Sequence, residues 1–197
     1  MNLANTPSQS RSQMVWDPFV RIFHWSLVGL FAIAFVTEDE WLNLHSFAGY
    51  SIVGLLLLRV IWGVIGSHHA RFSNFVTSPK ISVDYLKSFF AGKPKHYLGH
   101  NPAGAAMILM LMLTLLLTAL TGTAILATEG VGPLADTFFA GLSEDLLEDI
   151  HELLANLMLG LIVLHVGGVI VSSLAHRENL IRAMFNGRKV VQSEEKQ

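Results

Sequence analysis

Cysteine is absent from this chain of 197 residues. Without thiols the protein can form neither disulfides nor iron–sulfur clusters ligated by thiolates. Charged residues are also scarce, at 14% of the sequence, whereas soluble domains contain about 25%. Hydrophobic residues make up 52% of the chain, and the mean hydropathy is +0.49. This composition predicts a membrane protein rather than a soluble one.

Motifs of several soluble function classes are also missing. The sequence has no glycine-rich phosphate-binding loop, no zinc-protease signature and no basic arm of the kind that binds nucleic acid. We therefore expect no nucleic-acid partner. Histidine, with nine residues, is the one plentiful source of metal-ligating nitrogen.

Four apolar stretches are long enough to cross a bilayer, which takes about 20 residues in a helix. They run from about 18 to 36, 44 to 65, 102 to 127 and 150 to 174. The first stretch has features of a signal peptide, but its length and its internal His24 favour a helix that is retained. The sequence therefore predicts an all-α fold, a transmembrane four-helix bundle. The loop over 128–149 would hold either a short amphipathic helix or a solvated acidic segment.

Basic residues are confined to particular parts of the chain. All 13 Lys and Arg residues lie near the N-terminus, at the end of the second stretch and in the loop after it, or near the C-terminus. Because cytoplasmic segments retain Lys and Arg, we expect both termini and the middle loop to be cytoplasmic. Residues 1–14 and 188–197 would then be cytoplasmic tails on a membrane domain over 15–187. The two outer loops are acidic, which would attract a basic cytochrome c or would reflect charge sorting alone.

Four histidines lie in or at the edges of the apolar stretches, where ionisable side chains are costly and usually functional. In the expected topology His45 and His151 fall near the outer surface, and His24 and His165 fall in the cytoplasmic half. The 14 residues from His151 to His165 advance about 21 Å in a helix and turn about 1400°, some 40° short of four turns. The two rings therefore lie on nearly one helix face, as cofactor ligands in helical bundles do.

Two histidines at each level suit a haem. A structural zinc site takes four protein ligands and a catalytic site three, whereas haem supplies four equatorial nitrogens and leaves two axial positions. The sequence therefore predicts two non-covalent b-type haems with two histidine ligands each, restricted to electron transfer because no axial position is free for substrate. A proton relay is less consistent, since no Asp or Glu lies in the helix centres. An alternative from a different functional class is a haem-free, histidine-rich membrane module for metal binding or transport.

Short motifs along almost the whole chain carry a family resemblance. They are VWDPFVRIFHW (15–25), LHSFAGY (44–50), RVIWG (59–63), HARF (69–72) and GHNPAG (99–104), followed by the two histidines of the last stretch. Together they resemble the bacterial cytochrome b561 family, which includes the b-type cytochrome subunits of nickel–iron hydrogenases. The resemblance implies a dihaem electron-transfer cytochrome in the bacterial inner (plasma) membrane. It implies an inner haem between His24 and His165, and an outer haem between His45 and His151.

The resemblance also suggests partners. These are ubiquinone or menaquinone as substrate, and a periplasmic cytochrome c, a hydrogenase or another reductase subunit as redox partner. Some relatives of this kind are instead stand-alone proteins that oxidise superoxide and reduce quinone. The sequence assigns no catalytic residue, and it decides neither between these roles nor whether the chain forms a homodimer.

Four further residues are candidates for cofactor contacts. Arg21 and Arg59, near the cytoplasmic boundary, would bind haem propionates or quinone, or extend to lipid headgroups. His100 precedes the third stretch and could reach the inner haem edge or a quinone. Gly49 lies one turn after His45, where a missing side chain would leave room for a porphyrin or serve ordinary helix packing.

Overall fold

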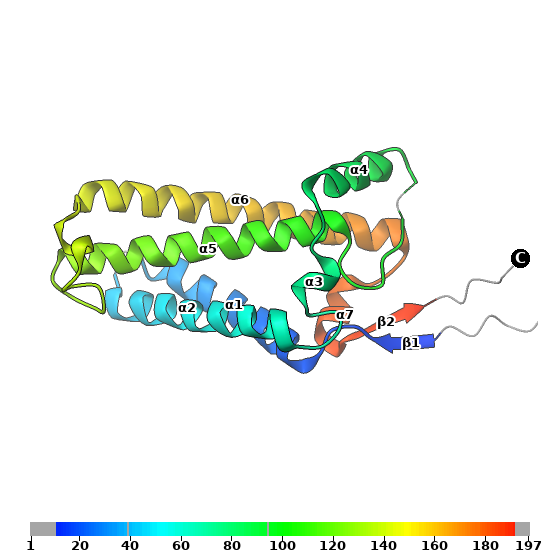
Figure 1. Cartoon of the computed structure of the whole chain (residues 1–197), viewed down its shortest axis with the longest axis horizontal. Coiled ribbons are helices and arrows are strands. Elements are labelled where there is room, and N and C mark those ends of the chain that lie inside the picture. Colours follow the sequence, from blue (N-terminus) through cyan, green and yellow to red (C-terminus); the bar gives the residue numbers. More distant parts are fainter. Residues whose placement is uncertain (1–10, 39, 94, 192–197) are drawn as a thin grey trace, which may run out of the picture.

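Four long helices lie side by side along the length of the molecule (Figure 1). The structure is a computed structural model that describes residues 11–38, 40–93 and 95–191. The long helices are α1 (Pro18–Val36), α2 (Leu42–Ile65), α5 (Pro102–Thr128) and α6 (Glu144–His176). Each is long and apolar enough to cross a membrane. The predicted all-α transmembrane four-helix bundle is therefore confirmed.

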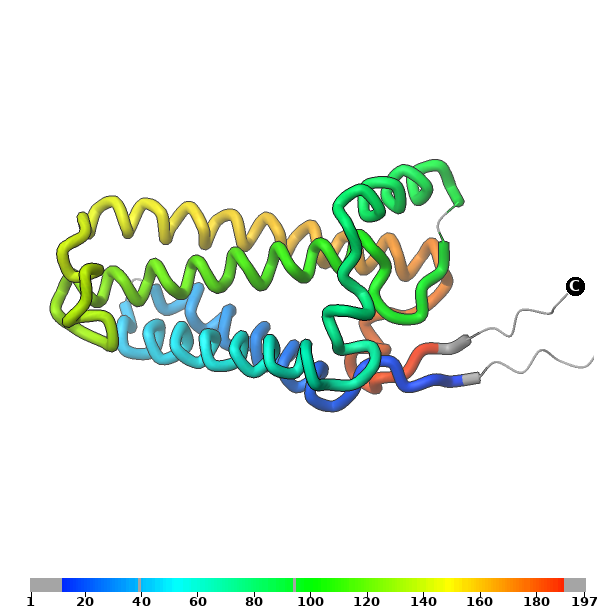
Figure 2. Tube along the Cα trace, viewed as in Figure 1, coloured from blue at the N-terminus to red at the C-terminus, as the bar shows by residue number. Residues whose placement is uncertain are grey.

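Smaller elements gather at one end of the bundle. They are α3 (Phe72–Phe75), α4 (Pro79–Phe90), α7 (Leu180–Asn186), β1 (Arg11–Met14) and β2 (Arg188–Val191). The strands β1 and β2 pair antiparallel, with Arg11 opposite Val191 and Met14 opposite Arg188. Residues 11–14 and 188–191 of the two expected tails thus meet in a small sheet that the sequence did not predict, and the rest of both tails lies outside the described residues. The chain therefore enters and leaves the bundle at the same end, as the colour trace in Figure 2 shows.

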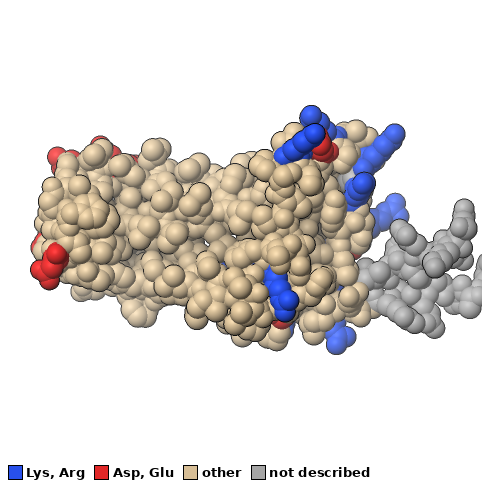
Figure 3. All heavy atoms as spheres, viewed as in Figure 1, with Lys and Arg blue, Asp and Glu red and all other residues tan. Residues whose placement is uncertain are grey.

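Charge is segregated along the bundle (Figure 3). Lys and Arg side chains lie at the end that carries α3, α4, α7 and the sheet, which we call the basic end. Most of the described Asp and Glu residues lie at the opposite, acidic end, where α1 meets α2 and α5 meets α6, whereas Asp17, Asp84 and Glu178 lie at the basic end. The spatial separation follows the sequence pattern, because the basic segments and the acidic loops fall at opposite ends of antiparallel helices.

Polar residues just before the helices fix where the helices begin. The Asp17 carboxylate accepts a hydrogen bond from the Val20 N–H at 2.9 Å, and the Asn101 side chain accepts one from the Gly104 N–H at 2.7 Å. Pro follows directly in both cases, where its missing N–H costs nothing. The WDP and HNP motifs are therefore helix starts.

The last long helix begins earlier than the sequence predicted. Ser143 caps it, so that α6 starts at Glu144 instead of about residue 150 and includes part of the predicted acidic loop. Acidic residues in its first turn interact favourably with the helix dipole. Of the short amphipathic helix considered for this loop, only a single 3-10 turn over Phe138–Gly141 forms.

Two clusters of buried apolar side chains hold the bundle together. One lies at the basic end and contains Val15, Trp16, Val20, Ala70 and Ala183, so it joins the segment before α1, α1 itself, the loop after α2, and α7. The other lies inside the bundle and contains Phe23, Ile52, Leu56, Leu115 and Met158. Met158 is midway along α6 between His151 and His165. The interior cluster therefore lies between the two predicted histidine levels.

Candidate haem sites

At the acidic end, the structure brings His45 of α2 opposite His151 of α6. Their ring centroids are 6.0 Å apart, with an angle of 67° between the ring planes. His45 Nδ1 lies 2.8 Å from the carbonyl oxygen of Ala34. Because a carbonyl oxygen can only accept, His45 Nδ1 carries the hydrogen and Nε2 keeps its lone pair for a metal.

Thr121 of α5 orients the second ring in the same way. His151 Nδ1 lies 3.0 Å from Thr121 Oγ1. The Thr121 hydroxyl is directed at the carbonyl oxygens of Leu117 and Thr118, at 3.1 and 2.8 Å. Since that hydroxyl donates to a carbonyl, it accepts from His151 Nδ1 and leaves Nε2 available. Metal-ligating histidines are usually oriented by such a bond from the other ring nitrogen.

The gap between these two rings is the right size for one metal ion. A metal–imidazole bond is about 2 Å, and the ring centre lies about 1 Å further on, so two imidazoles on opposite sides of one ion have centres about 6 Å apart. Within the part of the chain that the structure describes, no group of three or more His, Cys, Asp or Glu side chains could hold a metal ion. The residues therefore suit a cofactor such as haem, which brings its own equatorial ligands.

Two glycines border the acidic-end pair. A Cβ atom on Gly122 would lie 2.9 Å from Cε1 and 3.3 Å from Nδ1 of His151. A side chain at this position of α5 would therefore push the His151 ring away. A Cβ on Gly49 would meet nothing within 4 Å, so open space adjoins the helix one turn after His45. The sequence indicated Gly49 but not Gly122, because the residue beside Gly122 is 29 positions away in the chain.

At the basic end, His24 of α1 and His165 of α6 lie close enough to interact electrostatically. Both side chains are half-buried. His24 Nδ1 is buried and has no hydrogen-bond partner within the described part of the chain. A buried imidazole nitrogen without a partner calls for an explanation, and a ligand between the two rings would provide one.

His100 lies within electrostatic range of both His165 and Arg59. Arg59 is only 3% exposed, donates from Nη2 to the carbonyl oxygen of Ala70 at 3.1 Å, and lies 4.7 Å above the Phe72 ring. The His100 ring is held against Trp16, with centroids 4.4 Å apart, and on Phe75, at 4.8 Å. Burial and the nearby Arg59 charge lower the pKa of His100 to about 3, so its ring is neutral at physiological pH.

Arg21 has a protein partner of its own. Its Nη1 donates to the carbonyl oxygen of Phe185 at 2.6 Å, near the end of α7. Its Nε is buried without a hydrogen-bond partner among the described residues. Arg21 thus ties the start of α1 to the C-terminal segment, a contact that the sequence did not predict.

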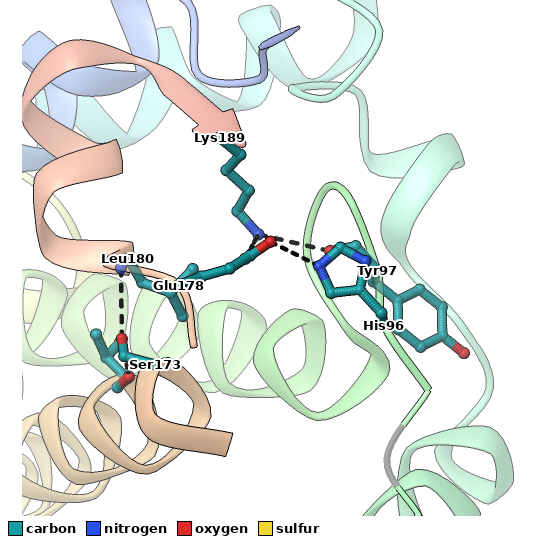
Figure 4. Close-up of polar contacts among 7 residues, drawn as sticks. His96, Tyr97, Ser173, Glu178, Leu180 and Lys189 are labelled. Carbon is teal, nitrogen blue, oxygen red and sulfur yellow. Dashed lines mark hydrogen bonds and ion pairs between the residues drawn. The ribbon is translucent and has the colours of Figure 1, made fainter. Parts of the chain in front are cut away.

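A buried ion pair at the basic end was also missed. Glu178, just after α6, lies between Lys189 of β2 and His96 in the loop after α4 (Figure 4). Its carboxylate oxygens are 2.7 Å from His96 Nε2 and 3.4 Å from Lys189 Nζ. Burial lowers the pKa of Lys189, while Glu178 opposes that shift. These residues are far apart in sequence and form no local motif, so no pattern indicated them.

Comparison with known proteins decides the family. Residues 15–187 match the family described as prokaryotic cytochrome b561. The chain belongs to the prokaryotic cytochrome b561 family. It is therefore a multi-pass membrane protein and a b-type cytochrome, which carries haem b and takes part in electron transport.

Curated relatives have a common name. The chain is 28% identical to a probable Ni/Fe-hydrogenase B-type cytochrome subunit of Rhizobium leguminosarum bv. viciae, over 95% of this chain and 92% of the relative. It is 30% identical to the protein of that name from Azotobacter vinelandii, over 73% of this chain and 65% of the relative. The alignment thus spans slightly less than two thirds of the Azotobacter protein. No solved structure gives a significant match.

Proposed function

We propose that this cytochrome b561 holds two haems and transfers electrons across the membrane between the quinone pool and a redox partner. The observation that carries the proposal is the facing pair His45 and His151, 6.0 Å apart with both Nδ1 atoms hydrogen-bonded to the protein. His24 and His165 would hold the second haem at the basic end. The two levels are 14 residues apart on α6, or about 21 Å along the helix axis.

The residues of this chain do four things in such a protein. Two histidines would hold each haem iron, and Ala34 and Thr121 would orient the acidic-end pair. The helix α6 would separate the two sites by a fixed length, and apolar side chains would exclude water from the interior. Haem supplies reversible one-electron chemistry when bound. Met158 and the apolar side chains around it fill the bundle between the two levels.

The charge distribution supports an orientation for this transfer. Positively charged segments stay on the cytoplasmic side of the inner membrane, so the basic end and both tails would be cytoplasmic. The acidic end would face outward and meet the redox partner. We favour a hydrogenase as that partner, because the curated relatives are named as hydrogenase cytochrome subunits. A basic cytochrome c would be attracted by the same acidic surface.

The first test is the haem content of the purified chain. In detergent, the reduced protein should show b-type absorption bands, and haem extraction should give two haems per chain. One haem per chain would contradict the two-site proposal. A colourless protein that binds a divalent ion would instead select a metal-binding module.

The second test separates the roles in electron transfer. Inner-membrane vesicles containing the protein and its partner should reduce added quinone when the partner's substrate is supplied, and vesicles with His165→Ala should not. Isolated protein that reduces quinone with superoxide alone would be an enzyme in its own right, contrary to the role of subunit proposed here.

A further inference from the structure

Arg59 is a permanently charged side chain buried in a membrane-spanning helix. One nitrogen of its guanidinium, Nη2, donates to the Ala70 carbonyl, while Nη1 is buried without a hydrogen-bond partner among the residues that the structure describes. No carboxylate forms an ion pair with Arg59 within residues 11–38, 40–93 and 95–191. A buried cation is costly unless an anion accompanies it. The site therefore calls for an anion that the protein itself does not supply.

The carboxylate of Asp17 interacts electrostatically with Arg59. Its two oxygens are already engaged, since they accept from the Val20 N–H, the Trp62 indole N–H and the Ser67 hydroxyl. These bonds fix Asp17 as the cap of α1 and as a link to the end of α2. Asp17 therefore reduces the cost of the Arg59 charge but does not pair with it.

His100 places a second unpartnered nitrogen nearby, which donates in the tautomer protonated at Nδ1. This Nδ1 is buried without a hydrogen-bond partner in the described part of the chain, and its ring lies against Trp16 and Phe75. An unbroken row of contacts joins it to Arg59: the Arg59 guanidinium lies on Phe72, Phe72 lies 5.7 Å from Phe75, and Phe75 lies 4.8 Å from His100. Packing therefore holds both unpartnered nitrogens in place before any ligand arrives.

Both donors lie at the level of the basic-end histidine pair. Arg59 is six residues before the end of α2, and His24 is six residues after the start of the antiparallel α1. Each is therefore about 9 Å from the basic end of its helix. His100 is also within electrostatic range of His165.

We propose that Arg59 Nη1 and His100 Nδ1 bind the propionate carboxylates of the basic-end haem and so fix which way round that haem lies. The inference rests on the proposed function, which places a haem between His24 and His165. A carboxylate both neutralises the guanidinium and accepts from the imidazole N–H. A neutral quinone would leave the Arg59 charge uncompensated, and lipid phosphates lie at the surface, whereas Arg59 is 3% exposed.

The experiment compares haem b with its dimethyl ester, in which both propionates are blocked. The full chain, purified from haem-starved cells in the His151→Ala background, is titrated with each porphyrin to isolate the basic-end site. Haem b should bind roughly 10- to 100-fold more tightly than the ester, the range for lost charge-assisted hydrogen bonds. Arg59→Gln should remove most of that preference. Arg71→Gln is the matched control, because Arg71 is exposed and bonded to the Gly66 carbonyl, and it should keep the preference.

Equal affinity of the unsubstituted site for haem b and its ester would overturn the inference, and this comparison requires no variant at Arg59 to fold. His100→Phe keeps the aromatic stack and removes the N–H, so it should lower the preference in part. Anionic lipid that copurifies and is lost only with Arg59→Gln, together with equal porphyrin affinities, would identify a headgroup phosphate instead. Absence of haem binding at either level would be a failure of the proposed function itself.

Discussion

The ring centroids of His45 and His151 are 6.0 Å apart, and each ring has its Nδ1 bonded to a neighbouring helix. The two residues are 106 positions apart in the sequence, so only the bundle brings them together. The second bonds matter as much as the separation, because they leave Nε2 of both rings unprotonated and available. An unrelated pair of membrane histidines would have no reason to share this arrangement.

Replacing one ligand should remove one haem and leave the other. His151→Ala removes an acidic-end ligand, so the haem content should fall from two per chain to one. His165→Ala should give the same stoichiometry by emptying the basic-end site. The pyridine haemochrome absorbance divided by the protein concentration measures both. His68→Ala, at an exposed position in the loop after α2, should keep two haems, and two haems in His151→Ala would rule out the assignment.

Removing the hydroxyl that orients His151 should weaken the acidic-end site without emptying it. Thr121→Val leaves His151 Nδ1 without its acceptor on that side chain, and loss of such outer partners typically costs tenfold or more in affinity. The less basic ligand should also raise the reduction potential of this haem, as a redox titration would measure.

The matched control for Thr121 is Thr123→Val in the same helix. Among the described residues, the Thr123 hydroxyl bonds to the carbonyl oxygen of Ala119, one turn back, so the Thr123→Val variant should behave like the unsubstituted protein. Equal effects of the two substitutions would show that His151 is oriented by something other than Thr121.

Adding one methyl group to α5 at Gly122 should displace the proposed ligand His151. In Gly122→Ala the new Cβ would lie 2.9 Å from His151 Cε1, closer than carbon atoms normally approach. The ring must move, so the acidic-end haem should be lost or show an altered absorption band. Gly54→Ala is the control, since a Cβ there meets nothing within 4 Å, and normal spectra for both variants would mean that the ring has room to move.

Hydropathy and residue spacing were enough to predict the four-helix architecture of this protein. The four spans were predicted because each is a long apolar run, and the histidine levels followed from topology and helical rise. The start of α6 was missed because Glu144 and Asp145 are polar, so a hydropathy window excludes a turn that the Ser143 cap and the helix dipole stabilise.

Contacts between distant segments could not be predicted in this way. Gly122 beside His151, Glu178 beside Lys189, and β1 beside β2 depend on how helices are placed around one another. Neither the periodicity of apolar residues nor the composition of the chain predicts how the helices are placed. Buried atoms without partners, such as Arg59 Nη1 and His100 Nδ1, become visible only when three-dimensional neighbours are known.

Asp17 should make the fold sensitive to acid. Burial opposes its charge, but hydrogen bonds from Ser67, Val20 and Trp62 outweigh burial and lower its pKa below the ordinary value of 3.8. The unfolded chain therefore binds a proton at Asp17 at a higher pH than the folded chain does. The stabilisation of the fold by ionised Asp17 is fully present above about pH 3.8 and is lost as the pH falls through the folded pKa. SDS unfolding midpoints should differ more between the unsubstituted chain and Asp17→Asn at pH 6 than at pH 3; a constant difference would contradict this.

Replacing Glu178 in the Glu178–Lys189 ion pair should destabilise the fold more than replacing Lys189. Lys189 is 6% exposed, so Glu178→Gln leaves a buried ammonium without its carboxylate, a change that costs about 3 kcal/mol or more in stability. Lys189→Met removes the buried charge itself and leaves Glu178 bonded to His96, so it should destabilise less. Asp84→Asn, which breaks the exposed pair with Lys87, should have no measurable effect.

The stability deficit of Glu178→Gln relative to the unsubstituted chain should also become smaller at alkaline pH. Burial already lowers the pKa of Lys189 below its ordinary value of 10.5, and loss of Glu178, which opposes that shift, lowers it further. The unfolded chain then holds a proton that the folded chain has released, so stability rises with pH between the folded pKa and 10.5. SDS unfolding of the two proteins at a series of pH values up to 10 measures the difference. A deficit that stays constant or grows with pH would contradict this expectation.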